Sequence, residues 1–183
     1  MVKGYLLIGS DNGSNLLDNQ KHPMGTRCPE CGYLLEFDYY NPFFKLKRKS
    51  YDYSQCYDLG IIVSLRFKEF CVRGNYPHLR FQEFDREPNF FLFTALEMVK
   101  FDTIKVKTEF KKKCNACGQY EEVFGIAPSA LSDEIDVLPD GFYRTDTLFG
   151  FGNTRHPLII ASPITLNKLK KEKMKGLYFE QVY

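Results

Sequence analysis

Apolar residues along the chain gather in short runs that turn-forming residues separate. Tyr5 to Ile8 is one such run, Tyr33 to Phe37 a second and Tyr120 to Ile126 a third. Short runs that are rich in aromatic and β-branched side chains are typical of strands. The pattern therefore predicts strands at these three places.

Two segments in the middle of the chain are predicted to form a hairpin. Residues 104–110 alternate between polar and apolar positions, and the apolar run 91–99 precedes them. Alternation with a period of two is the pattern of a half-buried strand, so the two segments would pair through a turn near Asp102. The polar and proline-broken segments 18–27 and 38–57 are predicted to be loops.

An internal repeat relates two distant segments. Ile61-Ile62-Val63-Ser64 and Ile159-Ile160-Ala161-Ser162 are closely similar, and their serines stand 98 positions apart. Each serine is predicted to cap a helix, which a closing strand follows. We therefore predict two strand–helix–strand units derived from one ancestral unit. The same offset relates Leu79 to Leu177, Phe81 to Phe179 and Phe84 to Val182.

Local signals predict the ends of both helices. Pro163 follows Ser162 and suits the first helical position, where the amide hydrogen that proline lacks has no partner in the helix. Gly74 is predicted to end the first helix. The second helix is predicted to run to about Lys175 and to end at Gly176.

Two matching CxxCG elements interrupt this pattern, at Cys28 to Gly32 and at Cys114 to Gly118. Each places two cysteines at a tight turn, which the glycine leaves with a backbone angle that other residues avoid. Together the elements supply the four thiolates of a closed tetrahedral zinc site. The predicted ligands of one structural Zn²⁺ ion are Cys28, Cys31, Cys114 and Cys117.

Two disulfides and a redox pair are the alternative interpretations of these cysteines. Both are weaker, because the N-terminal apolar run is too short for a signal peptide and neither element has a thioredoxin-like context. His22 lies near the first element and could replace one cysteine as a ligand. Cys56 and Cys71 are predicted to be free thiols in a reducing cytosol, with Cys71 in the core and no role assigned to Cys56.

The predicted fold class is α+β, with zinc-ribbon knuckles joined to two repeated strand–helix–strand units on a mostly antiparallel sheet. At 183 residues we expect a single compact domain, 1–183, with pseudo-repeated halves of about 1–88 and 89–183. Residues 128–141 are predicted to be an insertion that contains one or two helical turns at 132–136. The aromatic share of 16% favours structure rich in strands.

No catalytic constellation emerges from the remaining residues. Four cysteines on one ion leave no open position for substrate or water, so the zinc is predicted to be structural and the protein is predicted not to be an enzyme. Gly150-Phe151-Gly152 lacks the third glycine of a phosphate-binding loop. Each histidine is adjacent to a proline and is interpreted as a loop residue; the three are His22, His78 and His156.

The charges allow two kinds of partner. A net charge of +2 does not by itself predict a nucleic-acid binder, although Lys111 to Lys113 could face nucleic acid. More often such lysines keep a hairpin soluble and lie near thiolates. The lysines from Lys168 to Lys175 are interpreted as a solvated helix face. Acidic residues at 83–87 and 133–140 are ordinary surface charge or candidate contacts to a basic protein.

The motifs together resemble the double-CXXCG-motif immunity family. The resemblance covers nearly the whole chain, and the second element departs from the first only in lacking its proline. Family members are bacterial proteins encoded beside polymorphic or contact-delivered toxins, which they bind and neutralise. Besides the CxxCG elements, the resemblance rests on Ile61 to Ser64, Gly141 to Arg144, Pro157 to Ser162 and Gly176 to Glu180.

The resemblance implies a cytoplasmic, non-catalytic immunity protein. Its partner would be a cognate protein toxin encoded by the adjacent gene, with no membrane partner. The second interpretation is a zinc-ribbon nucleic-acid-binding or regulatory module, whose affinity would fall steeply with salt.

Overall fold

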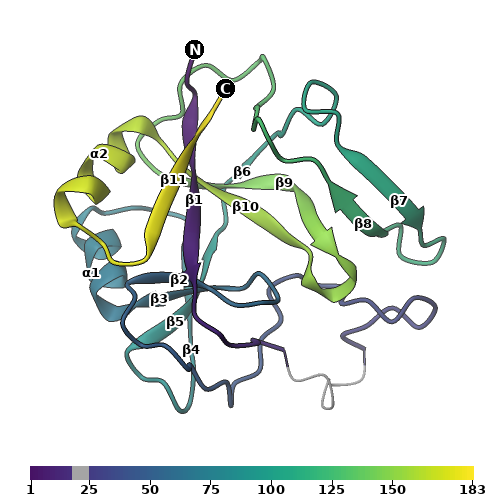
Figure 1. Ribbon diagram of the computed structural model, residues 1–183, viewed down its shortest axis with the longest axis horizontal. Helices are drawn as coiled ribbons and strands as arrows, with labels where there is room; N and C mark the ends of the chain where they lie inside the picture. Colours follow the sequence, from purple (N-terminus) through teal and green to yellow (C-terminus); the bar gives the residue numbers. More distant parts are fainter. Residues whose placement is uncertain (18–24) are drawn as a thin grey trace.

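The structure, a computed structural model, describes residues 1–17 and 25–183. These residues form one mixed sheet of 11 strands, with two helices at one side and a hairpin at the other (Figure 1). The elements are β1 (Gly4–Asp11), β2 (Tyr53–Gln55), β3 (Ile61–Ser64), α1 (Leu65–Arg73), β4 (Leu79–Glu83), β5 (Phe90–Ala95), β6 (Met98–Val99), β7 (Glu109–Lys113), β8 (Tyr120–Phe124), β9 (Phe142–Phe151), the 3₁₀ turn η1 (Gly152–Thr154), β10 (His156–Ala161), α2 (Pro163–Glu172) and β11 (Leu177–Val182).

The strands follow the order β4-β5-β3-β2-β1-β10-β9-β8-β7, while β11 pairs with β1 and β6 pairs with β9. The pairs β1–β2 and β6–β9 are parallel, and the other pairs are antiparallel. Strand β1 is the centre of the arrangement, since β10, β11 and β2 all pair with it.

The predicted fold class is wrong. The helices α1 and α2 hold only 9 and 10 residues, and the protein is mostly sheet. The two predicted strand–helix–strand units also have different surroundings: β3 lies between β2 and β5, whereas β10 lies between β1 and β9. A strand's place in a sheet is decided by partners distant in sequence, and a constant offset along the chain carries no information about them.

The predicted central hairpin is also wrong. Residues 103–107 form turns, and the strand that follows, β7, pairs with β8 instead. Residues 33–37 form no strand, and only an isolated bridge joins Arg27 to Leu34. Residues 132–136 contain no helix, and β2 lies inside the predicted loop 38–57. The predicted loop 18–27 lies partly outside the described residues.

The predicted helix starts are confirmed. The Ser64 hydroxyl accepts a hydrogen bond from the Phe67 amide at 3.3 Å, and the Ser162 hydroxyl accepts one from the Thr165 amide at 3.0 Å. Gly74 caps α1 as predicted, but α2 ends at Glu172, earlier than predicted. The residue after it, Lys173, has a φ of 52° and so turns the chain away from the helix.

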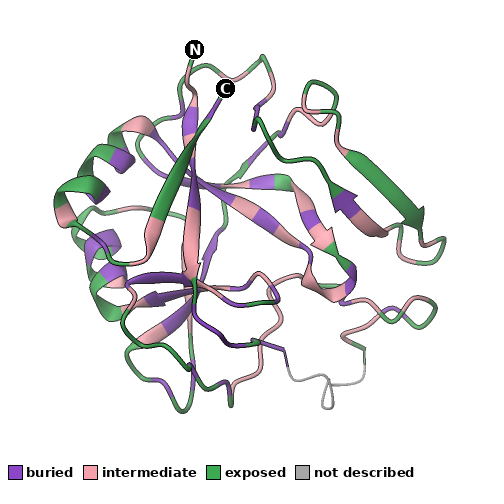
Figure 2. Cartoon of the chain, in the orientation of Figure 1, coloured by how far each residue is buried: buried purple, intermediate pink, exposed green. Residues whose placement is uncertain are grey.

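The helices cover an aromatic core. The ring of Phe67 from α1 is completely buried and lies 5.3 Å from Phe93 and 5.8 Å from Phe142, between centroids. Tyr53 from β2 packs on the same ring at 5.4 Å. Figure 2 shows the buried residues on the inner sides of both helices and along the central strands. This cluster joins the helices to the sheet.

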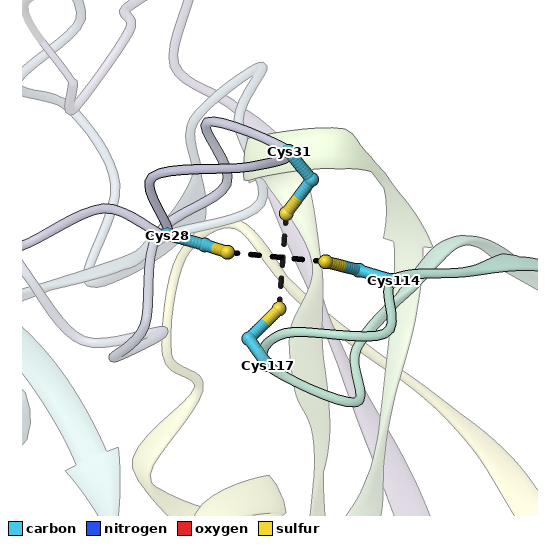
Figure 3. A group of neighbouring side chains, drawn as sticks. All are labelled: Cys28, Cys31, Cys114 and Cys117. Carbon is cyan, nitrogen blue, oxygen red and sulfur yellow. Dashed lines mark hydrogen bonds between the residues drawn. The ribbon is translucent and has the colours of Figure 1, made fainter.

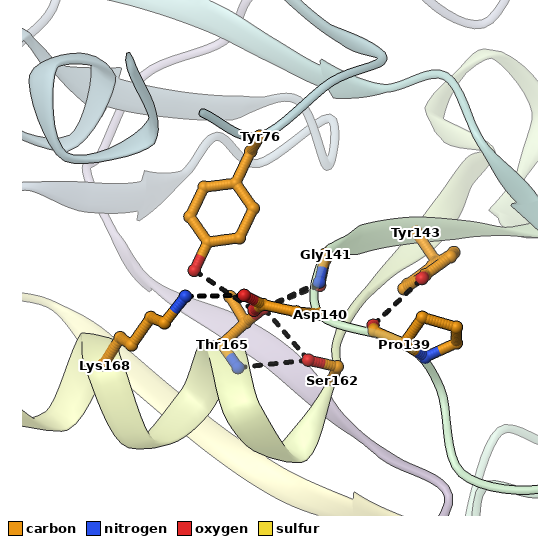
Figure 4. A network of polar contacts seen from close by, with 8 residues as sticks. All are labelled: Tyr76, Pro139, Asp140, Gly141, Tyr143, Ser162, Thr165 and Lys168. Carbon is orange, nitrogen blue, oxygen red and sulfur yellow. Dashed lines mark hydrogen bonds and ion pairs between the residues drawn. The ribbon is translucent and has the colours of Figure 1, made fainter. Parts of the chain in front are cut away.

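A polar network beside α2 fixes the turn before β9 (Figure 4). The Asp140 carboxylate accepts hydrogen bonds from the Thr165 hydroxyl at 2.8 Å and from the Lys168 ammonium at 2.5 Å. The Tyr76 hydroxyl reaches the same carboxylate at 3.4 Å. Segments far apart in sequence thus meet at one aspartate.

Candidate metal centre

The structure brings all four predicted cysteine ligands together. Their sulfur atoms lie within 4.8 Å of one another, and Figure 3 shows them pointing at a common centre. Two of the sulfur–sulfur distances are 3.8 Å, from Cys28 to Cys114, and 3.7 Å, from Cys31 to Cys117. A disulfide needs about 2.05 Å. A tetrahedral ion with bonds of about 2.3 Å to sulfur sets neighbouring sulfurs about 3.8 Å apart. The cluster therefore has the size of a metal site.

The two CxxCG turns have the same backbone geometry. In the first turn, Cys28–Gly32, the glycine amide donates to the Cys28 carbonyl at 2.9 Å, and in the second, Cys114–Gly118, the glycine amide donates to the Cys114 carbonyl at 2.9 Å. The glycines have φ values of 73° and 72°, a conformation that side chains disfavour. The second turn caps the β7–β8 hairpin, whereas the first is framed only by the bridge at Arg27. Matching local sequence has therefore given matching local structure.

The 3₁₀ turn η1 and the residue after it hold the two cysteine turns in place. The Asn153 side chain accepts from the Leu34 amide at 2.8 Å, just beyond the first turn. Arg155 donates to the Gln119 side chain, just beyond the second turn, and to the Gly152 carbonyl at 2.8 Å. Only 6% of Arg155 is exposed. Sequence reasoning missed both side chains, because no motif marks them.

The thiol groups need a cation to ionise together. Backbone amides of Cys31 and Glu30 lower the pKa of Cys28 to about 7. Burial raises the pKa of Cys31 to about 12 and raises the pKa of Cys117 as well. Thiolates at this separation repel one another, so a divalent ion at their centre supplies the charge that allows all four to bind it.

The Arg155 guanidinium interacts electrostatically with two of the cysteine sulfurs. Burial lowers the pKa of its guanidinium, and the sulfurs of Cys117 and Cys31 act in the opposite direction. The lysines before Cys114, in contrast, pair with carboxylates: Lys111 with Glu109 at 3.3 Å and Lys112 with Glu121 at 3.0 Å. Arg155, which lies outside the hairpin, is thus a buried cation that interacts with the cysteine cluster.

The donor set suits one class of ion. Four thiolates are soft ligands, and the distances match a tetrahedral ion with no open position, which is the arrangement of structural zinc sites. Cys28 is buried and the other three cysteines are partly buried. The four cysteines can therefore hold a metal ion as a crosslink between two distant parts of the chain.

The other predicted residues have separate places. His22 lies outside the described residues. His156 lies in strand β10, not in a loop, and burial lowers its pKa to about 4. Cys56 and Cys71 are free, as predicted, and Cys71 belongs to the aromatic core, also as predicted. Cys56 is buried as well. The amide of Asn12 reaches the Cys56 sulfur at 3.5 Å.

Comparison with known proteins adds no family assignment. No protein-family model matches this chain, and no curated protein matches it. Within the described residues, no helix combines the length and the apolar character needed to cross a membrane.

Proposed function

We propose that this protein is a bacterial immunity protein, which binds and neutralises a cognate protein toxin and uses a structural four-cysteine zinc site as part of its scaffold. The closed four-sulfur cluster carries the proposal. Because the chain provides every ligand that a tetrahedral ion needs, the metal has no position for a substrate and serves to stabilise the fold. The resemblance to the double-CXXCG-motif immunity family supplies the partner.

The proposed role is that of a non-catalytic inhibitor in the cytoplasm. Thiolate ligands and the two buried free thiols, Cys56 and Cys71, are stable in a reducing compartment. An inhibitor of this kind works by covering the working surface of its target, so it needs a rigid fold with an exposed binding face rather than a reactive group.

The charge pattern of the hairpin weighs against the nucleic-acid-binding interpretation. Lys111 lies 3.3 Å from Glu109 and 3.7 Å from Glu122, and Lys112 lies 3.0 Å from Glu121. Nucleic-acid binding requires a concentrated basic face whose charges are free to replace counterions. Carboxylates interleave with the lysines here, which dilutes such a face.

Co-expression with the product of the adjacent gene tests the proposal. We expect that product to stop growth when expressed alone, and we expect this protein to restore growth and to co-purify with it in a 1:1 complex. A Cys114→Ser variant should lose zinc and protect less well. Growth arrest that persists with the wild-type protein, or restored growth without a complex, would contradict direct neutralisation.

A further inference from the structure

Strand β11 has one free edge. It pairs with β1 alone among the described strands. The Ser10 amide donates to the Gly176 carbonyl at 2.7 Å, which sets the alternation of the ladder. Along an antiparallel strand alternate residues turn both backbone groups to the same neighbour. The backbone groups of Tyr178 and Glu180 therefore face β1, and those of Phe179 and Gln181 face outward.

This edge already accepts a short segment of the chain beyond β11. The Tyr183 amide donates to the Ser129 carbonyl at 3.0 Å, and the Leu131 amide donates to the Tyr183 carbonyl at 2.6 Å. The edge from Leu177 to Gln181 continues this line and has no such cover among the described residues. It is thus a ready template for one more extended segment.

Two edge strands of the sheet, β7 and β11, differ in how they are protected. The outermost strand β7 is wholly exposed and carries Lys111, Lys112 and Lys113, the side chains that commonly keep strand edges apart. Strand β11 contains neither lysine nor proline, and its Tyr178 and Phe179 are 61% and 40% exposed. Figure 2 shows the exposed stretch along the middle of β11. An edge that is left open and aromatic is suited to binding.

A hollow lies on each face of this strand. Residues opposite in register share a face, so Glu180 lies with Leu6 and Tyr178 with Ile8. On that face is a cleft of about 390 Å³, whose far wall contains Phe124 and Ile126. On the other face a hollow of about 190 Å³ lies between β11 and α2, lined by Leu166, Leu169, Lys170, Lys173, Leu177 and Phe179.

The charges of the two hollows have opposite signs. Glu180 is the charged residue that lines the larger cleft, and no ion pair of its carboxylate is found in the described part of the chain. The smaller hollow contains Lys170, whose ammonium lies 4.5 Å from the centre of the Phe179 ring, and Lys173. A strand added here would meet a negative charge on one face and positive charges on the other.

We propose that the free edge of β11 receives an extended segment of the toxin as an additional strand. Its apolar side chains would enter both hollows, a lysine or arginine would face Glu180, and an acidic residue would face Lys170 and Lys173. The inference rests on the proposed function and names the surface that performs it. Backbone hydrogen bonds to Phe179 and Gln181 provide the pairing, and the two hollows provide the specificity.

A second copy of this chain is a poorer occupant. A two-fold antiparallel pairing centred on Glu180 would set two carboxylates opposite each other, which is unfavourable. A pairing centred on Phe179 would set Glu180 against Tyr178 and leave the carboxylate without a cation. The charges of the edge therefore favour a different partner.

A matched pair of variants at Gln181 tests the strand pairing in the complex with the adjacent gene product. Gln181→Ala and Gln181→Pro both remove the exposed side chain, but only proline removes the outward amide hydrogen. We expect Gln181→Pro to bind the adjacent gene product more weakly than Gln181→Ala does, by a factor of about ten or more. Unchanged thermal unfolding of both variants would show that the fold is kept.

Hydrogen exchange of the wild-type complex gives a second measurement that needs no variant. The amides of Phe179 and Gln181 should exchange more slowly in the complex, whereas those of Tyr178 and Glu180, already bonded to β1, should change little. Glu180→Lys should weaken binding more than Glu36→Lys, which makes the same charge change at an exposed site distant in sequence.

The possible failures are distinct. If the toxin binds but exchange at Phe179 and Gln181 is unchanged and the Gln181 variants bind alike, the edge is not the docking site and the immunity function stands. If the adjacent product does not bind at all, both proposals fail. A wild-type dimer that Gln181→Pro dissociates would show that the occupant is a second copy, and that would also overturn the inference.

Discussion

The hairpin that carries the second cysteine turn differs from the helix-covered core in how much of it is buried. In strand β7 every residue is exposed, and in β8 only Val123 is buried. In the core, by contrast, Phe67 and Tyr53 are fully enclosed, and their rings contact one another and the ring of Phe93. A hairpin with so little buried area gains little from hydrophobic contacts, so a metal ion bound by its cysteines would contribute a large part of its stability.

The contrast suggests separate roles for the cysteine cluster and the hydrophobic core. The cysteine turns lie 86 residues apart in sequence, and a metal ion bound between them would close a long loop at the end of the sheet far from the helices (Figure 1). Hydrophobic burial stabilises the opposite end, where two helices close over aromatic rings. Each end should therefore respond to its own perturbation.

The largest expected effect is the loss of the metal. Cys117→Ser, or treatment with a strong chelator, should abolish zinc binding and cost on the order of 10 kcal/mol of metal-linked folding energy. Amides of β7 and β8 should then exchange rapidly, while those of β3 and β5 keep their protection. Metal analysis and hydrogen exchange measure the two outcomes. Cys71→Ala, in the core, should keep one zinc per chain.

The reverse perturbation is Phe67→Ala. Removing this completely buried ring should lower the free energy of unfolding by about 3 to 5 kcal/mol, because it leaves a cavity between α1 and the sheet. Zinc stoichiometry of the folded protein should not change. Urea unfolding gives the stability, and Phe43→Ala, at a ring that is 59% exposed, should cost less than about 0.5 kcal/mol. Loss of zinc from folded Phe67→Ala would contradict the view that the two ends of the molecule are stabilised independently.

A smaller effect is expected at Arg155, which supports the cysteine turns without binding the metal. Arg155→Ala should weaken metal binding by about 10- to 100-fold, since it removes the side chain that positions Gln119 beside the second cysteine turn. Competition with a chromophoric chelator measures the affinity. Arg155→Lys keeps the charge but loses the planar guanidinium, so its metal affinity should lie between that of the wild type and that of Arg155→Ala. An affinity equal to that of the wild type would mean that the cysteine turns position themselves.

The smallest expected effect concerns Asp140, at the helix end. Burial acts to raise the pKa of this carboxyl, but hydrogen bonds from Lys168 and Thr165 outweigh it, and the pKa is lowered from 3.8. A carboxyl whose pKa is lower in the folded state than in the unfolded state stabilises the protein at pH values above the unfolded-state pKa. This contribution disappears as the pH falls through the folded-state pKa. At pH 7, Asp140→Asn should therefore cost about 1 kcal/mol.

Measured against pH, the difference between wild type and Asp140→Asn should shrink as the pH falls below about 4. Asp136→Asn, at an exposed residue of the same loop, should have no effect at any pH. Metal affinity should be the same in all three proteins, because Asp140 contacts α2 and not the cysteine turns. A pH-independent loss in Asp140→Asn would point to the hydrogen bonds alone.

Local features of the fold were predictable because their causes are local. The caps at Ser64 and Ser162 follow from one side chain and the amide three residues later. The cysteine turns follow from two thiols and a glycine that tolerates a positive φ. The ligand set followed as well, because only a closed site uses two such turns together.

Features that depend on distant partners were not predictable. The alternating segment 104–110 resembled a strand, but residues 104–107 form turns, and only its last two residues belong to β7, whose partner β8 lies beyond the second cysteine turn. The similar junctions at Ser64 and Ser162 lie in different parts of the sheet. The side chains Asn153 and Arg155 belong to the metal centre only because β9 brings them to it.

The sequence by itself determined the chemistry of the metal site and the ends of the helices, since these depend on side chains within a few residues of one another. Only the tertiary structure decided the strand order, the outer support of the cysteines and the open edge of β11. Those depend on which strand lies beside which, and pairing energies between strands are set by burial and neighbours that no short stretch of sequence contains.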